Sequence, residues 1–189
     1  MNNTKTKTKS YLFAAIGFLL TLALDQWTKY LASTILRRLE SFSLISGVFE
    51  LRYLENRGAA FGIMQNRQIV FVVGGIIILA VILYLYQKMP FTPHYRPLRI
   101  CAVLLASGAV GNMIDRVKLD YVVDFFYFRL IDFPIFNVAD CYVVIACSLF
   151  VVLILFYYKD DNDFEFLNFK NRSKRTTGRI LKAYGRTSF

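Results

Sequence analysis

The segments YVVDFF (residues 121–126) and FPIFNVAD (residues 133–140) lie between two long apolar runs of the chain. Each segment carries one aspartate, Asp124 or Asp140, where a membrane-spanning segment would meet water. An ionisable side chain at such a place is costly and usually has a function. Two neighbouring carboxylates do not ionise together easily, and a protonated one beside an ionised one can hydrolyse a peptide bond with water. We therefore predict that Asp124 and Asp140 form an acid–base pair.

The composition is that of a membrane protein. Of the 189 residues 56% are apolar, and the mean hydropathy is +0.44, which is unusual for a soluble domain. A helix needs about 20 residues to cross the hydrocarbon core of a bilayer. Four apolar runs reach this length alone or with their flanks: residues 11–24, 69–86, 100–114 and 138–158. The sequence therefore predicts an all-α membrane protein with four transmembrane helices.

The distribution of charge predicts the orientation of these helices. The net charge is +10, and residues 1–10, 87–99 and 159–189 together carry fourteen basic and four acidic side chains. Residues 25–68 and 115–140 carry nine of each. By the positive-inside rule, both termini and the 87–99 loop are cytoplasmic, and the two balanced segments face outward. We expect a four-helix membrane domain over residues 1–158 and a basic cytoplasmic tail over residues 159–189.

Between the first two apolar runs the pattern changes. Residues 41–61 mix aromatic and aliphatic side chains with serine, glycine and charges, which favours strands over a helix. We predict a small extracytoplasmic β element over about 41–61. It leads into ENRGAAFG (residues 55–62), where small residues permit a close approach of the backbone and Asn56 offers both a donor and an acceptor.

Three further groups of polar residues have two interpretations each. Asp25 and Lys29 are four residues apart on one helical face, and they form either a local ion pair or a support for the site. Arg116 either braces helices by pairing with a carboxylate such as Asp115 or Asp25, or lines the site. Asn137 can cap the last helix, and the negative charge of Asp140 three residues later interacts favourably with the helix dipole. Asp140 therefore either stabilises this helix only or has a role in the site.

The residue inventory narrows the possible chemistry. The sequence has no H-E-x-x-H motif, and its single histidine, His94, lies in the predicted cytoplasmic loop, which argues against a zinc site or a serine–histidine nucleophile on the outer side. A serine–lysine pair built on Lys29 stays open. Two rival functions also stay open, a small membrane transporter and a non-enzymatic lipoprotein-binding factor. The transporter is disfavoured because its acidic residues would gather at one interface.

Five motifs in order resemble those of a known family, lipoprotein signal peptidase, also called signal peptidase II: DQWTK (25–29), NRGAAFG (56–62), GNMIDR (111–116), VVDF (122–125) and FNVAD (136–140). The resemblance covers about residues 25–144. It implies a multi-pass aspartic endopeptidase of the bacterial cytoplasmic (inner) membrane, with its active site at the extracytoplasmic interface. Such an enzyme cleaves the signal peptide from diacylglyceryl-modified prolipoproteins immediately before the lipidated cysteine.

The resemblance also implies roles for single residues. It makes Asp124 and Asp140 the catalytic dyad, without a metal or other cofactor. Seven more positions match those that line or support the site: Asn56, Gly58, Asn112, Arg116, Asn137, Asp25 and Lys29. We expect the partners to be diacylglyceryl-modified prolipoproteins and membrane lipids, with no nucleic acid, and the protein to be a monomer. The basic tail after Lys159 is longer than the family pattern and its role stays open.

Overall fold

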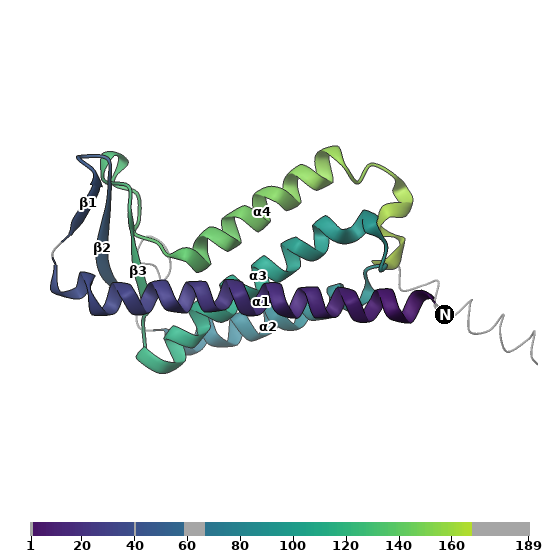
Figure 1. Ribbon diagram of the computed structural model, residues 1–189, viewed down its shortest axis with the longest axis horizontal. Coiled ribbons are helices and arrows are strands. Elements are labelled where there is room, and N and C mark those ends of the chain that lie inside the picture. The colour runs from purple at the N-terminus through teal and green to yellow at the C-terminus, as the bar shows by residue number, and fades with distance from the viewer. Residues whose placement is uncertain (1, 40, 59–66, 168–189) are drawn as a thin grey trace, which may run out of the picture.

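The structure is a computed structural model, which describes residues 2–39, 41–58 and 67–167. Four helices, α1 (Asn2–Thr34), α2 (Gln68–Lys88), α3 (Arg96–Leu119) and α4 (Val138–Phe156), form the body (Figure 1). Three strands, β1 (Phe42–Ile45), β2 (Phe49–Asn56) and β3 (Val122–Tyr127), form a small sheet. Short 3-10 turns connect or follow these elements: η1 (Leu36–Arg38), η3 (Pro93–Tyr95), η4 (Arg129–Ile131) and η5 (Asp161–Leu167).

Helices form over all four predicted spans. Each of the four helices is long and apolar enough to cross a membrane. Helix α1 continues past Leu24 to Thr34, as the polar face after Leu24 predicts. Large apolar side chains such as Phe13 on α1, Ile77 on α2 and Phe156 on α4 are exposed on the outside of the bundle. Such side chains are stable against lipid tails, so the exposed surface is the one a bilayer would cover.

Helix α3 lies at the centre and packs against α1, α2 and α4. Two glycines allow this close approach. A methyl group on Gly108 would lie 2.6 Å from the carbonyl oxygen of Ala139 on α4, and one on Gly111 would overlap the carboxylate of Asp25 on α1. Small residues at helix interfaces are typical of membrane bundles, because packing there depends on close backbone contact.

The sheet is antiparallel with the order β1-β2-β3. Two of its strands fall within the β element predicted over 41–61, whose last residues, 59–61, lie outside the described residues. The third strand was not predicted, and it is the one that carries Asp124. Its residues Val123 and Phe125 pack against Ala32 and Leu36 at the end of α1, so β3 joins the sheet to the bundle.

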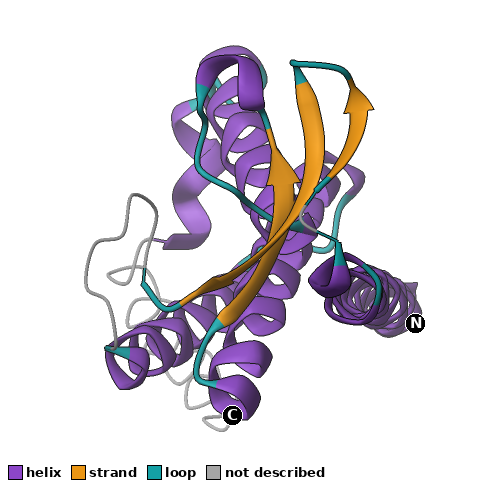
Figure 2. Cartoon of the chain, turned by 90° about the vertical axis from the view of Figure 1, so that its left-hand side faces the viewer, coloured by secondary structure: helices purple, strands orange, loops and turns teal. Residues whose placement is uncertain are grey.

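The molecule therefore has two distinct ends, which we call the sheet end and the terminal end. The three strands lie beside the last turns of α1 and beyond the start of α4, and the start of α1 and η5 lie at the other end (Figure 1). Viewed from the sheet end, the strands cross in front of the helices (Figure 2). Both limits of the described chain thus lie on the same side of the bundle, as four spans require.

Candidate active site

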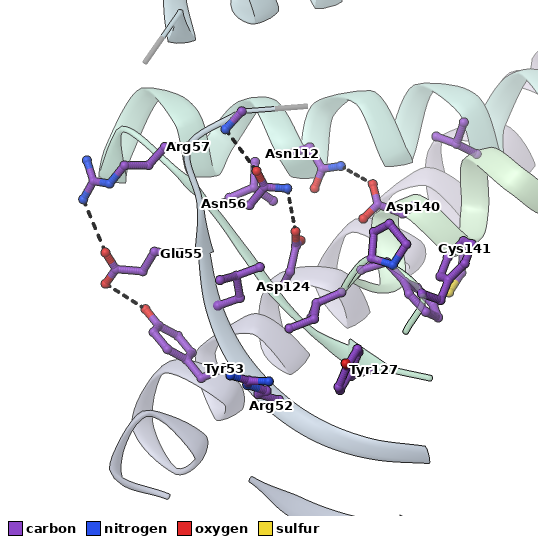
Figure 3. A pocket seen from close by; sticks show the side chains of 18 of the residues that line it. Arg52, Tyr53, Glu55, Asn56, Arg57, Asn112, Asp124, Tyr127, Asp140 and Cys141 are labelled. Carbon is purple, nitrogen blue, oxygen red and sulfur yellow. Dashed lines mark hydrogen bonds and ion pairs between the residues drawn. The ribbon is translucent and has the colours of Figure 1, made fainter. Parts of the chain in front are cut away.

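A cavity of about 1170 Å³ opens at the sheet end. Strands β2 and β3 supply its polar wall, and the loop 133–136 and residues 143–145 of α4 supply an apolar wall. Asp124 and Asp140 both line it, from β3 and from the first turn of α4 (Figure 3). Two carboxylates from separate elements therefore face one space that combines a polar and an apolar side.

Asp124 is almost completely buried, with 1% of its surface exposed. The side-chain amide of Asn56 donates to Asp124 Oδ2 at 2.8 Å, and that of Asn137 donates to Oδ1 at 2.6 Å. Burial, and next the charge of Asp140, raise the pKa of Asp124 to about 7, while the two asparagines and Lys29 act in the opposite direction. Asp124 is thus a carboxyl group that holds a proton near neutral pH.

Asp140 is half-buried and closes a capping box at the start of α4. The Asn137 side chain accepts from the Asp140 N–H at 3.0 Å, and Asp140 Oδ2 accepts from the Asn137 N–H at 3.1 Å. Its other oxygen accepts from the side-chain amide of Asn112 at 2.7 Å (Figure 3). The predicted cap is therefore confirmed, and the same carboxylate also reaches the cavity.

Two asparagines link the aspartates. Asn137 Nδ2 donates to Asp124 and also to Asn112 Oδ1, the latter at 3.1 Å. Asn112 in turn donates to Asp140. A continuous path of hydrogen bonds thus joins the two carboxylates through carboxamides that are fixed at both ends.

A buried ionic cluster lies behind this path. Lys29 Nζ lies 3.0 Å from Asp25 Oδ2, 3.1 Å from Asp115 Oδ2 and 2.9 Å from Asn112 Oδ1. All three charged residues are at most 4% exposed. The Asp25–Lys29 pair is therefore both the local ion pair and a neighbour of the site, so the two interpretations of it are compatible.

The partner expected for Arg116 was wrong. Asp25 and Asp115 pair with Lys29, whereas Arg116 donates to the carbonyl oxygens of Asn112 and Gly58, each at 3.3 Å. Arg116 also lies over the Phe71 ring and lines the cavity. The Gly58 N–H donates to Asn56 Oδ1. The bond from Arg116 to the Gly58 carbonyl therefore also helps to hold Asn56 toward Asp124.

The structure brings all nine residues named from the sequence into this one region. Three other contributors were missed: Asp115 as a partner of Lys29, Gln26, which bonds both Asp25 and Asp115, and Gly111, which makes room for Asp25. Within the described ranges, no group of three or more His, Cys, Asp or Glu is arranged to hold a metal ion.

Four apolar helices, a sheet at one end and two carboxylates in a cavity are the features of a multi-pass membrane protein with an acidic site. The comparisons with known proteins specify the family. Residues 17–156 match the family model of signal peptidase II, so the chain belongs to that family.

Its relatives agree. The chain is 42% identical over 134 residues to the lipoprotein signal peptidase of Caldanaerobacter subterraneus subsp. tengcongensis, covering 70% of this chain and 89% of that one. It is 40% identical over 151 residues to that of Streptococcus thermophilus strain CNRZ 1066, covering 78% and 93%. A solved structure described as a bacterial membrane enzyme at 2.3 Å resolution superposes with a TM-score of 0.71 at 31% identity, covering 79% of this chain and 92% of that chain.

Proposed function

We propose that the protein is an aspartic endopeptidase that cleaves the signal peptide from lipoprotein precursors, immediately before a diacylglyceryl-modified cysteine. The observation that carries this proposal is the pair of carboxylates, Asp124 and Asp140, on one cavity with a polar and an apolar wall. The relatives named lipoprotein signal peptidase support the same substrate class.

The balance of charge supports one shared proton in the dyad. Four carboxylates of the site face two cations, Lys29 and Arg116, so full ionisation would leave two uncompensated negative charges in a buried place. Burying unpaired charge is costly, and a carboxyl group in such a place takes up a proton instead. Asp124 is the more buried member and its pKa is raised to about 7, so we assign the proton to Asp124.

The reaction follows from this assignment. Ionised Asp140 accepts a proton from a water molecule in the cavity, and the resulting hydroxide attacks the carbonyl carbon that precedes the cysteine. Protonated Asp124 donates to the carbonyl oxygen. When the tetrahedral intermediate collapses, the C–N bond breaks and the dyad returns a proton to the leaving amine of the cysteine, giving a new carboxyl terminus and a free amine. Asn56, Asn112 and Asn137 hold both carboxylates in place throughout.

The two walls fit the two halves of such a substrate. The apolar wall, with Phe133, Ile135 and Val144, suits acyl chains and the apolar signal helix, while β2 and β3 suit the polar backbone at the scissile bond. We place the sheet end at the outer face of the bacterial cytoplasmic (inner) membrane and both termini in the cytoplasm, because the described basic segments 4–10 and 87–99 lie at the other end. We also propose that the protein acts as a monomer, since the hydrogen-bond network that holds the two aspartates closes within one chain.

The test is cleavage of a diacylglyceryl-modified prolipoprotein by purified protein in lipid. We expect Asp124→Asn and Asp140→Asn each to lower kcat at least about a thousandfold, since the first removes the proton donor and the second removes the base. Asp120→Asn is the matched control. Asp120 is exposed at the end of α3 in a left-handed conformation that asparagine tolerates, so this variant should keep full activity.

A substrate without the lipid should resist cleavage by the wild type. Substantial cleavage by either dyad variant would refute the two-aspartate mechanism. If the wild type cleaved the unlipidated substrate as fast as the lipidated one, the apolar wall would not be the binding site of the acyl chains.

A further inference from the structure

Lys29 occupies an unusual position for a lysine in a membrane helix. Its side chain is 3% exposed, and its ammonium group has three hydrogen-bond donors. Three oxygens lie around it at 2.9–3.1 Å, those of Asp25, Asp115 and Asn112. Every donor of Lys29 therefore has an acceptor, and the position of the charge is fixed.

Each of the three acceptors continues to an element that carries one of the two aspartates. Asp25 Oδ1 accepts from the Ala139 N–H at 2.9 Å, which fixes the start of α4 next to Asp140. Asp115 Oδ2 accepts from the Val123 N–H at 3.2 Å, which fixes β3 next to Asp124. Asn112 is the third, and because its oxygen faces Lys29, its amide faces Asp140.

We propose that Asp115 and Lys29 are positioning residues for the reaction, which together fix the separation of Asp124 and Asp140 and, through their opposite charges, set how tightly the pair holds its proton. This inference rests on the proposed function. Neither residue needs to touch the substrate, since both act through Val123, Asn112 and the field at the dyad.

The charged environment of Asp124 supports opposite effects of the two residues. The charged groups that act on it are Asp140 from α4, Lys29 from α1 and Arg116 from α3, while Asp115 of α3 accepts from the N–H of the neighbouring Val123. Strand β2 offers the uncharged Asn56, and Glu55 and Arg57 turn away (Figure 3). The charge of Lys29 lowers the pKa of Asp124, so its removal should raise that pKa. Asp115 bonds the residue next to Asp124, so removal of its negative charge should lower the pKa of Asp124.

The experiment is the pH profile of kcat/KM for the full-length protein in lipid, with diacylglyceryl-modified substrate, between about pH 5 and pH 9. We compare wild type with Lys29→Met, Asp115→Asn and the control Asp120→Asn. Relative to wild type, the alkaline limb should move up by roughly half a unit to one unit in Lys29→Met and down by a similar amount in Asp115→Asn. The kcat values should fall about 10- to 100-fold with KM changed less than about threefold.

A purely structural role gives a different result. Lost packing would lower activity in both variants without moving the two limbs in opposite directions, and that outcome overturns the inference. If Lys29→Met does not fold, Lys29→Gln replaces it, because its amide can still donate to Asn112 without the charge. A wild type that does not cleave refutes the proposed function itself, whereas a cleaving wild type with unmoved limbs in both variants refutes only this inference.

Discussion

The two ends of the bundle bury polar groups in different ways. At the sheet end, asparagines from β2, α3 and α4 donate to Asp124 and Asp140, and Lys29 of α1 donates to one of these asparagines. At the terminal end, aromatic rings dominate. The ring of His94 lies 5.0 Å from those of Tyr95, Tyr157 and Tyr158, and the guanidinium of Arg99 lies 3.9 Å from the Phe91 ring.

The polar contacts at the terminal end tie connections together. Asp163 of η5 lies 2.8 Å from His94 Nε2 and accepts from the Tyr95 hydroxyl through its carbonyl oxygen, and Arg99 donates to the Met89 carbonyl at 2.6 Å. These bonds hold the α2–α3 connection and the segment after α4. Buried polarity alone therefore does not identify a site, whereas convergence of side chains on a cavity does.

At the sheet end, the buried carboxyl group of Asp124 should make the stability of the protein depend strongly on pH. Its folded pKa of about 7 lies above the value of 3.8 of a free side chain, so the folded state holds the proton more tightly. The stabilisation this gives is complete below about pH 4 and is lost as the pH rises to about 7. Three pKa units correspond to about 4 kcal/mol as an upper limit.

Asp124→Asn removes this dependence. We expect thermal unfolding in detergent to show the variant gaining on wild type between pH 4.5 and pH 8, with Asp120→Asn showing no such gain. A stability difference between variant and wild type that stays constant with pH would mean that Asp124 titrates normally.

The next effect concerns the close contact between α1 and α3. A methyl group on Gly111 would overlap Asp25 Oδ2 and displace Asp25 from Lys29 and Ala139. We expect Gly111→Ala to lower kcat/KM about 100-fold, or about 2.7 kcal/mol, because small displacements of a dyad have effects of this size.

Gly74→Ala on α2 is the matched control, since a methyl group there meets nothing within 4 Å. It should leave kcat/KM unchanged and stabilise the helix slightly. Equal losses of kcat/KM in both glycine variants would indicate a general effect of alanine in the spans. The close contact of Gly111 with Asp25 would then not explain the loss.

Local patterns predicted much of this architecture. The four spans follow from the length of the apolar runs, and the cap at Asn137 and the Asp25–Lys29 pair follow from spacings of three and four residues. Each of these features depends on residues that are close in the sequence. The catalytic roles of Asp124 and Asp140 stay predictions.

Long-range contacts were beyond such patterns. Strand β3 forms by pairing with β2, where Asp124 lies opposite Leu54, and nothing near residue 124 indicates that partner. Arg116 was expected to pair with a carboxylate such as Asp115 or Asp25, but both of these carboxylates pair with Lys29 instead. Lys29, the actual partner of Asp115, is on α1 and could be found only once α1 was known to pack against α3.

An aspartate-to-asparagine substitution at the terminal end should have a much smaller effect than the same substitution at the sheet end. His94 and Asp163 form a partly exposed pair, with 39% and 13% of their side chains exposed, and such pairs contribute about 0–1 kcal/mol. Asp163→Asn keeps an acceptor for His94, so the free energy of unfolding should fall by less than about 1 kcal/mol and kcat/KM should stay within about twofold of wild type. The corresponding change at the sheet end, Asp115→Asn, should lower kcat at least tenfold in the same assay. A tenfold loss in Asp163→Asn would instead show that the terminal end is coupled to the dyad through α3 and α4, and the functional division between the two ends would be wrong.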